Sequence, residues 1–159
     1  MVVTALERIV VSADVEATRA LGAALARAAA AGDVVALTGD LGAGKTQFAK
    51  GFGAGLGISD TINSPSFVLM SEYAGRLRLF HIDLYRLADA RDAIAGGLHD
   101  ERQEDGVTLI EWAERLGDVL PADRLDIEIA GSGDEPRQIR VRATSPGFAR
   151  YLEALEALG

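Results

Sequence analysis

Apolar residues along the chain occur in short β-type runs separated by longer stretches of helical periodicity. The runs at residues 8–11, 34–37 and 107–111 are short and rich in Val, Ile and Leu, which predicts buried strands. The stretches between the runs carry apolar residues three and four positions apart, which predicts amphipathic helices. Helices interleaved with buried strands indicate an α/β fold.

Two helices are predicted in the first third of the chain. Ser12 is the expected N-cap of the first helix, which we expect to run to about Ala31. Its inner face consists of Val15, Thr18, Leu21, Leu25 and Ala28. The second helix contains Gly51 and Gly53, which each cost about 1 kcal/mol relative to alanine, so we expect close packing against the sheet at both positions.

Two pairs of adjacent β-type segments predict hairpins, which would make the sheet mixed. Residues 66–73 and 77–84 flank a tight turn at Ala74–Gly75, and a later pair flanks Gly131–Gly133. Residues 58–66 are expected to form an exposed loop. Residues 88–105 are polar and alanine-rich and are expected to form a helix and a loop. A closing helix is predicted with Ser145 as cap and Pro146 at its first position. Its apolar face consists of Phe148, Tyr151, Leu152, Leu155 and Leu158.

Composition narrows the class of protein. The chain has 159 residues, a net charge of −8 and no cysteine, which excludes disulfides and thiolate metal sites. An acidic surface disfavours independent binding of nucleic acid. No run is apolar enough for a membrane span, and the first residues lack the features of a secretory signal, so a cytoplasmic location is expected.

The stretch GDLGAGKT at 39–46 matches the G-x-x-x-x-G-K-[ST] phosphate loop. It follows an apolar strand and precedes a helix, which is the context that this motif requires. In such loops backbone N–H groups bind phosphate oxygens, the Lys side chain reaches the β- and γ-phosphates, and the hydroxyl ligates Mg²⁺. Lys45 and Thr46 occupy those two positions here, and the predicted nucleotide contacts are Gly39, Asp40, Leu41, Gly42, Ala43, Gly44, Lys45 and Thr46.

The motif therefore predicts a three-layer, P-loop NTPase-like α/β fold with a mixed central sheet flanked by helices. We expect residues 1–159 to form a single domain of this kind.

Two further apolar runs end in an acid: LFHID at Asp83 and VTLIE at Glu111. Ligands in open α/β folds bind at the carboxyl ends of the strands, so both acids are candidates for Mg²⁺ binding and for acting on the attacking water. The alternative is that either acid caps a helix or pairs with an arginine such as Arg86. His81 alternates with Ile82 and is expected to be structural, on the core face.

Ser64 and Ser66 lie in a loop after the phosphate-loop helix, where switch segments of NTPases occur. On its own the S-P-S sequence indicates no more than a turn. Trp112 is the only tryptophan. Core packing is its simplest interpretation, and its adjacency to Glu111 makes a role toward nucleotide or a partner a second one.

Four segments taken together resemble the bacterial TsaE family. They are GDLGAGKT at 39–46, SPSF at 64–67, HIDLYRL at 81–87 and IEW at 110–112, in that order. HIDLYRL is the most specific of them, because the phosphate loop is shared by many families. Ser66 stands where the family usually has threonine, which retains the hydroxyl.

The resemblance implies a function and partners that composition and spacing do not. It implies a Mg²⁺-dependent ATPase of low intrinsic activity that supports synthesis of N6-threonylcarbamoyladenosine at position 37 of tRNA. ATP hydrolysis would reset a complex of the proteins TsaB and TsaD, with tRNA met only through that complex. It also implies that Thr46, Asp83 and Glu111 serve metal and hydrolysis and that Ser64 and Ser66 form a switch-like loop.

Three other classes of nucleotide-binding protein fit the sequence less well. A GTPase would need the guanine-reading N-K-x-D, but Asn63 is the only asparagine and Ser64 follows it. A small P-loop kinase would need an arginine-rich lid, which residues 88–105 resemble poorly. A nucleotide-sensing adaptor without hydrolysis would not need both Asp83 and Glu111.

Overall fold

The computed structural model describes residues 6–40, 42–63, 70–85, 101–156 and 158. Seven strands form one mixed sheet in the order β1-β7-β6-β2-β5-β4-β3. Strands β6, β2, β5 and β4 are parallel, whereas β1, β7 and β3 pair antiparallel at the two edges. The strands are β1 Glu7–Ser12, β2 Val34–Gly39, β3 Met70–Tyr73, β4 Arg78–Asp83, β5 Gly106–Glu111, β6 Leu125–Ala130 and β7 Arg137–Ala143.

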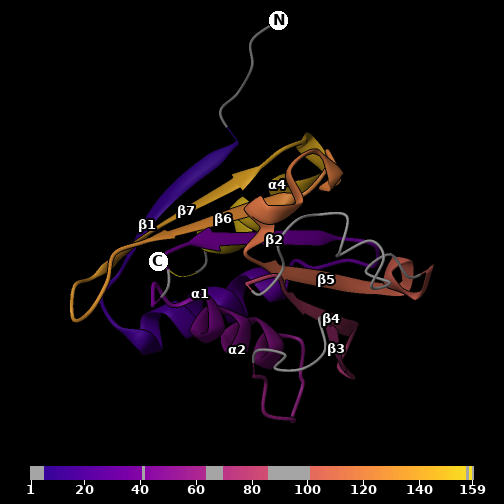
Figure 1. The fold of residues 1–159 in the computed structure, drawn as a ribbon, viewed down its shortest axis with the longest axis horizontal. Helices are drawn as coiled ribbons and strands as arrows, with labels where there is room; N and C mark the ends of the chain where they lie inside the picture. The colour runs from indigo at the N-terminus through magenta and orange to yellow at the C-terminus, as the bar shows by residue number, and fades with distance from the viewer. Residues whose placement is uncertain (1–5, 41, 64–69, 86–100, 157, 159) are drawn as a thin grey trace, which may run out of the picture.

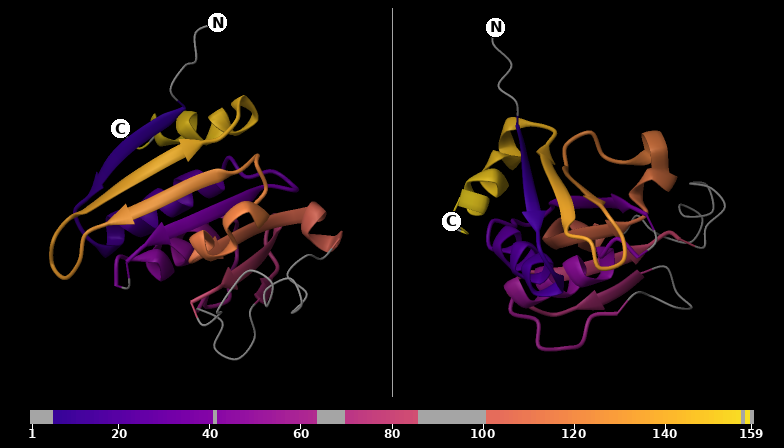
Figure 2. Two further views of the ribbon diagram at one scale, coloured as in Figure 1. Left: turned by 45° about the horizontal axis from the view of Figure 1, so that its top comes forward. Right: turned by 90° about the vertical axis from the view of Figure 1, so that its left-hand side faces the viewer.

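Helices α1, α2 and α4 pack on one face of this sheet (Figures 1 and 2). The opposite face is covered by a 3₁₀ segment, η2, through a smaller apolar cluster. The helical elements are α1 Val15–Ala26, α2 Lys45–Gly55, η1 Glu101–Asp105, η2 Ala113–Val119, η3 Pro146–Phe148 and α4 Ala149–Glu156. The predicted mixed sheet flanked by helices is confirmed.

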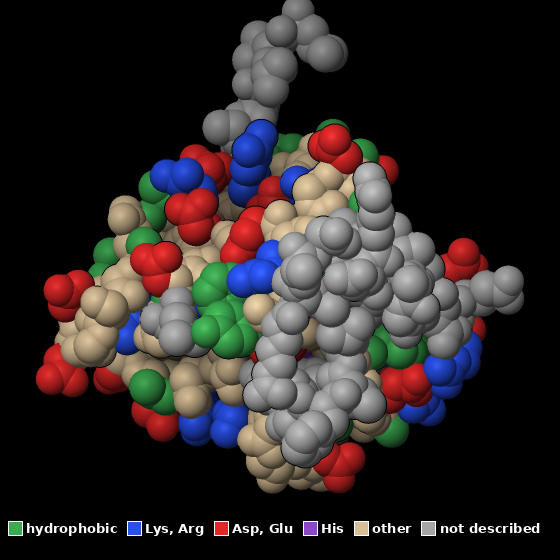
Figure 3. Space-filling view, viewed as in Figure 1, with side chains coloured by type: hydrophobic (Ala, Val, Ile, Leu, Met, Phe, Trp, Pro, Cys, Tyr) green, Lys and Arg blue, Asp and Glu red, His purple; other side chains and the backbone are tan. Residues whose placement is uncertain are grey.

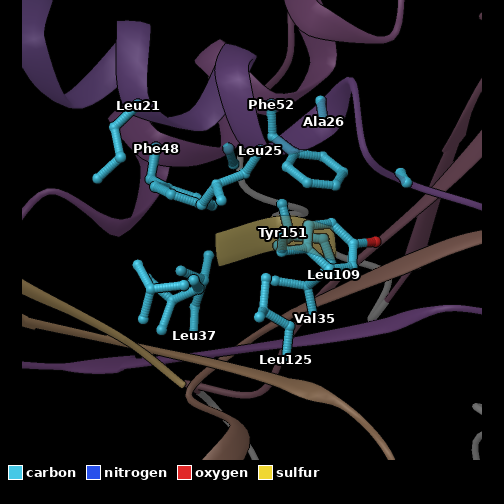
Figure 4. Packing of buried hydrophobic residues seen from close by; sticks show 14 of the residues in the cluster. Leu21, Leu25, Ala26, Val35, Leu37, Phe48, Phe52, Leu109, Leu125 and Tyr151 are labelled. Atoms are coloured by element: carbon cyan, nitrogen blue, oxygen red, sulfur yellow. The ribbon is translucent and has the colours of Figure 1, made fainter. Parts of the chain in front are cut away.

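The main core lies between the three helices and the sheet, because every second side chain of a strand faces the helices and each helix is apolar on one side. The central strands β4 and β5 are buried on both faces of the sheet. Figure 4 shows Leu21 and Leu25 of α1 and Phe48 and Phe52 of α2 above residues of the sheet, with Tyr151 of α4 among them. This packing fixes α2, and with it the loop at its N-terminus, against the strands.

The first helix differs from its prediction at both ends. Asp14, not Ser12, is the N-cap, and its Oδ1 accepts a hydrogen bond from the N–H of Ala17. Ser12 belongs to β1, and its hydroxyl lies 2.7 Å from the Thr18 hydroxyl instead. The helix ends at Ala26 and not at Ala31. The N–H groups of Ala28 and Ala29 donate to carbonyl oxygens three residues earlier, and the N–H of Ala30 donates to the carboxylate of Asp33.

The two glycines of α2 do reflect close packing, although not against the sheet. A Cβ at Gly51 would lie 2.0 Å from the carbonyl oxygen of Arg19, so α1 and α2 touch at this point. A Cβ at Gly53 would lie 1.9 Å from the side chain of Ile62. Ile58 and Ile62 are buried, whereas residues 59–61 and 63 are exposed. The predicted exposed loop is therefore confirmed where it is described, and these two side chains anchor it to the core.

Both predicted hairpins are confirmed, as β3–β4 and β6–β7. The closing helix begins as predicted with Pro146, but it ends at Glu156, and Leu158 is 46% exposed. Of the segment 88–105, residues 88–100 lie outside the described residues, and the rest forms η1.

Acidic and basic side chains are interspersed over the face seen in Figure 3. Within the described parts of the chain, no helix is long and apolar enough to cross a membrane.

Candidate functional site

The loop between β2 and α2 carries the GDLGAGKT sequence. Gly39 ends the strand with a φ of 146°, and a Cβ there would lie 2.5 Å from the carbonyl oxygen of Ile129. Gly44 caps α2 with a φ of 114° and offers no side chain to the helix N–H groups. The sequence therefore leaves the N-terminus of α2 available to an anion, which the helix dipole also favours. Leu41 lies outside the described residues.

Lys45 begins α2 and folds back over its own loop. Its Nζ donates to the carbonyl oxygens of Gly39 at 2.6 Å and Asp40 at 2.8 Å. The same atom lies 4.1 Å from the centre of the Trp112 ring. Burial lowers the pKa of Lys45 below its ordinary value, and the carboxylate of Glu111 opposes that shift. A buried ammonium with this environment is suited to an anionic ligand.

The two predicted acids lie side by side at the carboxyl ends of parallel strands. Asp83 ends β4, Glu111 ends β5, and the two are register partners. Asp83 Oδ1 accepts a hydrogen bond of 2.9 Å from the N–H of Tyr85. Glu111 is 2% exposed, and its Oε1 accepts from the Thr46 hydroxyl at 3.4 Å. Strand β5 therefore carries its acid to the start of α2.

These residues surround a cleft of about 310 Å³. Its lining is Gly42, Gly44, Lys45, Thr46, Gln47, Asp83, Tyr85, Glu111 and Trp112. Of the predicted site residues, Gly39 and Asp40 contact Lys45 from the loop, and Ala43 is buried beneath it. Ser64 and Ser66 lie outside the described residues.

Trp112 adopts a left-handed backbone conformation, with φ 59° and ψ 39°. It is the only non-glycine with positive φ in the described part of the chain. Such a conformation costs a bulky residue roughly 1–2 kcal/mol. The ring packs against Tyr85, with 5.1 Å between centroids, and faces Lys45. The interpretation of Trp112 as a residue facing the site is the one that matches its position in the cleft wall.

Sequence reasoning missed three contributors to this region. Tyr85 and Gln47 line the cleft. Their only signal was position, because Tyr85 lies within HIDLYRL and Gln47 directly follows GDLGAGKT. Arg137 begins β7 and donates to the carbonyl oxygens of Ala43 at 2.8 Å and Gly42 at 3.3 Å. No local pattern indicates that contact, because 94 positions separate Arg137 from Ala43.

The sheet order, the glycine-bracketed loop and the paired acids define an α/β protein of the P-loop-like fold. A crystal structure of Bacillus subtilis YdiB superposes with a TM-score of 0.80 at 35% identity, covering 99% of each chain.

Sequence comparison identifies the family. Residues 12–139 match the family model described as threonylcarbamoyl adenosine biosynthesis protein TsaE. The tRNA threonylcarbamoyladenosine biosynthesis protein TsaE of Bacillus subtilis (strain 168) is 43% identical over 141 residues, which are 88% of each chain. The protein of the same name from Treponema pallidum (strain Nichols) is 41% identical over 82% of this chain and 97% of its own. This chain belongs to the TsaE family, as its motifs predicted.

Proposed function

We propose that this protein is an ATPase that supports synthesis of N6-threonylcarbamoyladenosine at position 37 of tRNA. The observation that carries the proposal is the convergence of Lys45, Thr46, Asp83 and Glu111 on one cleft beside an open helix N-terminus. Family membership supplies the biosynthetic context.

ATP would enter this cleft with its phosphates at the N-terminus of α2. The loop N–H groups and the helix dipole bind the anion there. Lys45 would exchange its bonds to the carbonyl oxygens of Gly39 and Asp40 for bonds to β- and γ-phosphate oxygens. The exchange keeps the ammonium hydrogen-bonded in both states, so no charge is left buried and unpaired.

The oxygen-bearing side chains fit Mg²⁺ bound jointly with nucleotide. Mg²⁺ takes oxygen ligands, usually one or two carboxylates together with phosphates and water. Thr46, Asp83 and Glu111 supply such oxygens, whereas the described residues hold no group of three His, Cys, Asp or Glu that would bind a metal alone. When bound, the ion would neutralise charge on the β- and γ-phosphates.

The two acids have different surroundings, which suggests a division of labour. Asp83 holds the N–H of Tyr85 and is half-buried, so it is placed to orient metal-bound water. Glu111 is buried and directs Oε1 toward Thr46, so it is placed to orient the water that attacks the γ-phosphate.

The partners proposed are TsaB and TsaD, with hydrolysis resetting their complex between turnovers and tRNA met only through it. The net charge of −8 argues against direct tRNA activation. Isolated P-loop NTPases hydrolyse slowly, on the order of 10⁻⁴–10⁻² s⁻¹, until a stabilising group arrives.

The test is ATP hydrolysis by the purified protein, alone and with the TsaB–TsaD pair, with GTP as a second substrate. We expect slow hydrolysis alone, marked stimulation by the pair, and preference for ATP. Hydrolysis that the pair leaves unchanged would contradict the partner assignment, and absence of hydrolysis with the pair would contradict the ATPase itself.

A further inference from the structure

His81 lies beneath the cleft, in the middle of β4, and is completely buried. Its Nε2 is 2.6 Å from Oε2 of Glu111, and the Glu111 side chain is itself 3% exposed. Its Nδ1 is buried and has no hydrogen-bond partner among the described residues. His81 and Glu111 therefore form a buried polar pair between two neighbouring strands of the sheet.

The geometry selects one arrangement of protons. A carboxylate accepts hydrogen bonds and donates none, so Nε2 must carry the hydrogen that joins the pair. Among the described residues, a hydrogen on Nδ1 would be a buried donor without an acceptor, which is unfavourable. Donation of Nε2–H to Oε2 is therefore the hydrogen bond that joins the two side chains.

This hydrogen bond gives the two carboxylate oxygens of Glu111 different surroundings. Oε2 is held by the ring from below, and Oε1 is left toward Thr46 at 3.4 Å. The ring comes from the same strand as Asp83, two residues earlier, so the backbone of β4 fixes the distance between the ring and the second acid. Glu111 can therefore present one oxygen to the cleft, in one orientation.

We propose that His81 is a positioning residue for nucleotide hydrolysis, which holds Oε2 of Glu111 so that Oε1 faces the attacking water. The proposal rests on the ATPase function proposed above. His81 does not line the cleft, whereas Glu111 does. It acts on the reaction through Glu111 alone.

A purely structural role makes a different prediction. Filling a sheet interior does not require a polar pair, because apolar residues of similar size are often equally or more stabilising. If His81 only packs, a leucine there leaves turnover intact. If it positions Glu111, turnover falls while ATP binding at the loop persists.

The test compares His81→Leu and His81→Gln with the native protein, all with TsaB–TsaD. Loss of a group that orients a functional ligand typically reduces activity by about 10–100-fold, which is the fall in kcat expected for His81→Leu. ATP affinity, measured by calorimetry, should change by less than about 3-fold, since the phosphate contacts remain. Glutamine carries an N–H at nearly the reach of Nε2, so His81→Gln should recover most of the turnover.

Thr108→Val is the matched control, because Thr108 is a buried polar residue of β5 that does not line the cleft. It should leave kcat unchanged. A double variant, His81→Leu with Glu111→Gln, should be no slower than Glu111→Gln alone, because both changes remove the same oriented carboxylate.

Native turnover in His81→Leu would overturn the proposal, as would multiplicative losses in the double variant. If the His81→Leu variant does not fold, His81→Gln and His81→Asn are compared instead. The shorter asparagine amide should lose the turnover that glutamine keeps. Equal turnover in these two variants would overturn the proposal. A native protein that hydrolyses no ATP with TsaB–TsaD would refute the proposed function itself, which these variants cannot do.

Discussion

Two buried carboxylates lie at opposite ends of the parallel strands, and their surroundings differ. Asp33 lies just before β2 and is 7% exposed, whereas Glu111 ends β5 and is 2% exposed. Asp33 accepts hydrogen bonds from the N–H of Ala30, the Arg150 guanidinium and the Tyr151 hydroxyl. Glu111 accepts one short bond from His81 and one long bond from Thr46.

The difference separates structure from chemistry. The donors to Asp33 join α4 to the start of β2, and the phenol pKa of Tyr151 is raised by burial and by that carboxylate. Among the described residues, the hydrogen bond to Oε1 of Glu111 is the long one from Thr46, and Glu111 lines a cleft. Burial and charge are common to both sites, so they do not identify the functional one. What distinguishes it is an oxygen left available to a ligand.

The largest effect is expected on ATP binding from Lys45→Ala, which removes the ammonium group from the cleft at the Glu111 end of the parallel strands. Loss of charged hydrogen bonds to phosphate should weaken ATP binding by at least about 100-fold, roughly 3 kcal/mol. Calorimetric titration with ATP measures this, and circular dichroism checks that the fold is kept. Native affinity in a folded variant would show that Lys45 does not bind phosphate.

Replacing the acids of the cleft should separate hydrolysis from binding. Glu111→Gln and Asp83→Asn should each lower kcat about 100-fold, because the interactions removed act mainly in the transition state. Their ATP affinity should stay within a few fold of native. Single-turnover hydrolysis measures the rates, and unchanged rates in both variants would assign these acids a structural role.

Asp33→Ala should lower stability and leave the rate of hydrolysis unchanged. It leaves the Arg150 guanidinium and the Tyr151 hydroxyl without their shared acceptor, which should lower the free energy of unfolding by about 2–4 kcal/mol. Urea denaturation measures the loss. The folded variant, assayed at low temperature, should retain native kcat; a fall as large as that of Glu111→Gln would remove the distinction between the two carboxylates.

Arg137→Ala should have the smallest effect. The guanidinium donates to the carbonyl oxygens of Gly42 and Ala43 in the phosphate loop and to those of Gly133 and Glu135 in the turn before β7, so its loss should loosen the loop. We expect KM for ATP to rise about 3–10-fold, consistent with one or two partly exposed hydrogen bonds. Steady-state kinetics measure it; Arg140→Ala is the matched control, because Arg140 of the same strand does not contact the loop.

Much of the site could be predicted because its signals are local. The GDLGAGKT loop and the acids that end LFHID and VTLIE each lie within one short segment. Parallel strands bring such ends together, as Asp83 and Glu111 show. The mixed sheet was likewise predictable, from two hairpins with turn residues between them.

The remaining features depend on contacts between distant segments. Ser12 and Asp14 both suit an N-cap, and the pairing of β1 with β7 decided between them. Alanine propensity would continue the first helix, but the N–H of Ala30 is bonded to the carboxylate of Asp33 and not to a helical carbonyl. The His81–Glu111 bond joins two strands, so strand alternation could place the ring on the core face but could not name its partner.

The central claim is that ATP turnover at the Glu111 end of the sheet supports tRNA modification. Nucleoside mass spectrometry of total tRNA tests it, in cells that lack the native protein and express Glu111→Gln, Lys45→Ala or Asp33→Asn at matched levels. We expect loss of threonylcarbamoyladenosine with Glu111→Gln and Lys45→Ala, and native levels with Asp33→Asn. Full modification in cells carrying only Glu111→Gln would contradict it.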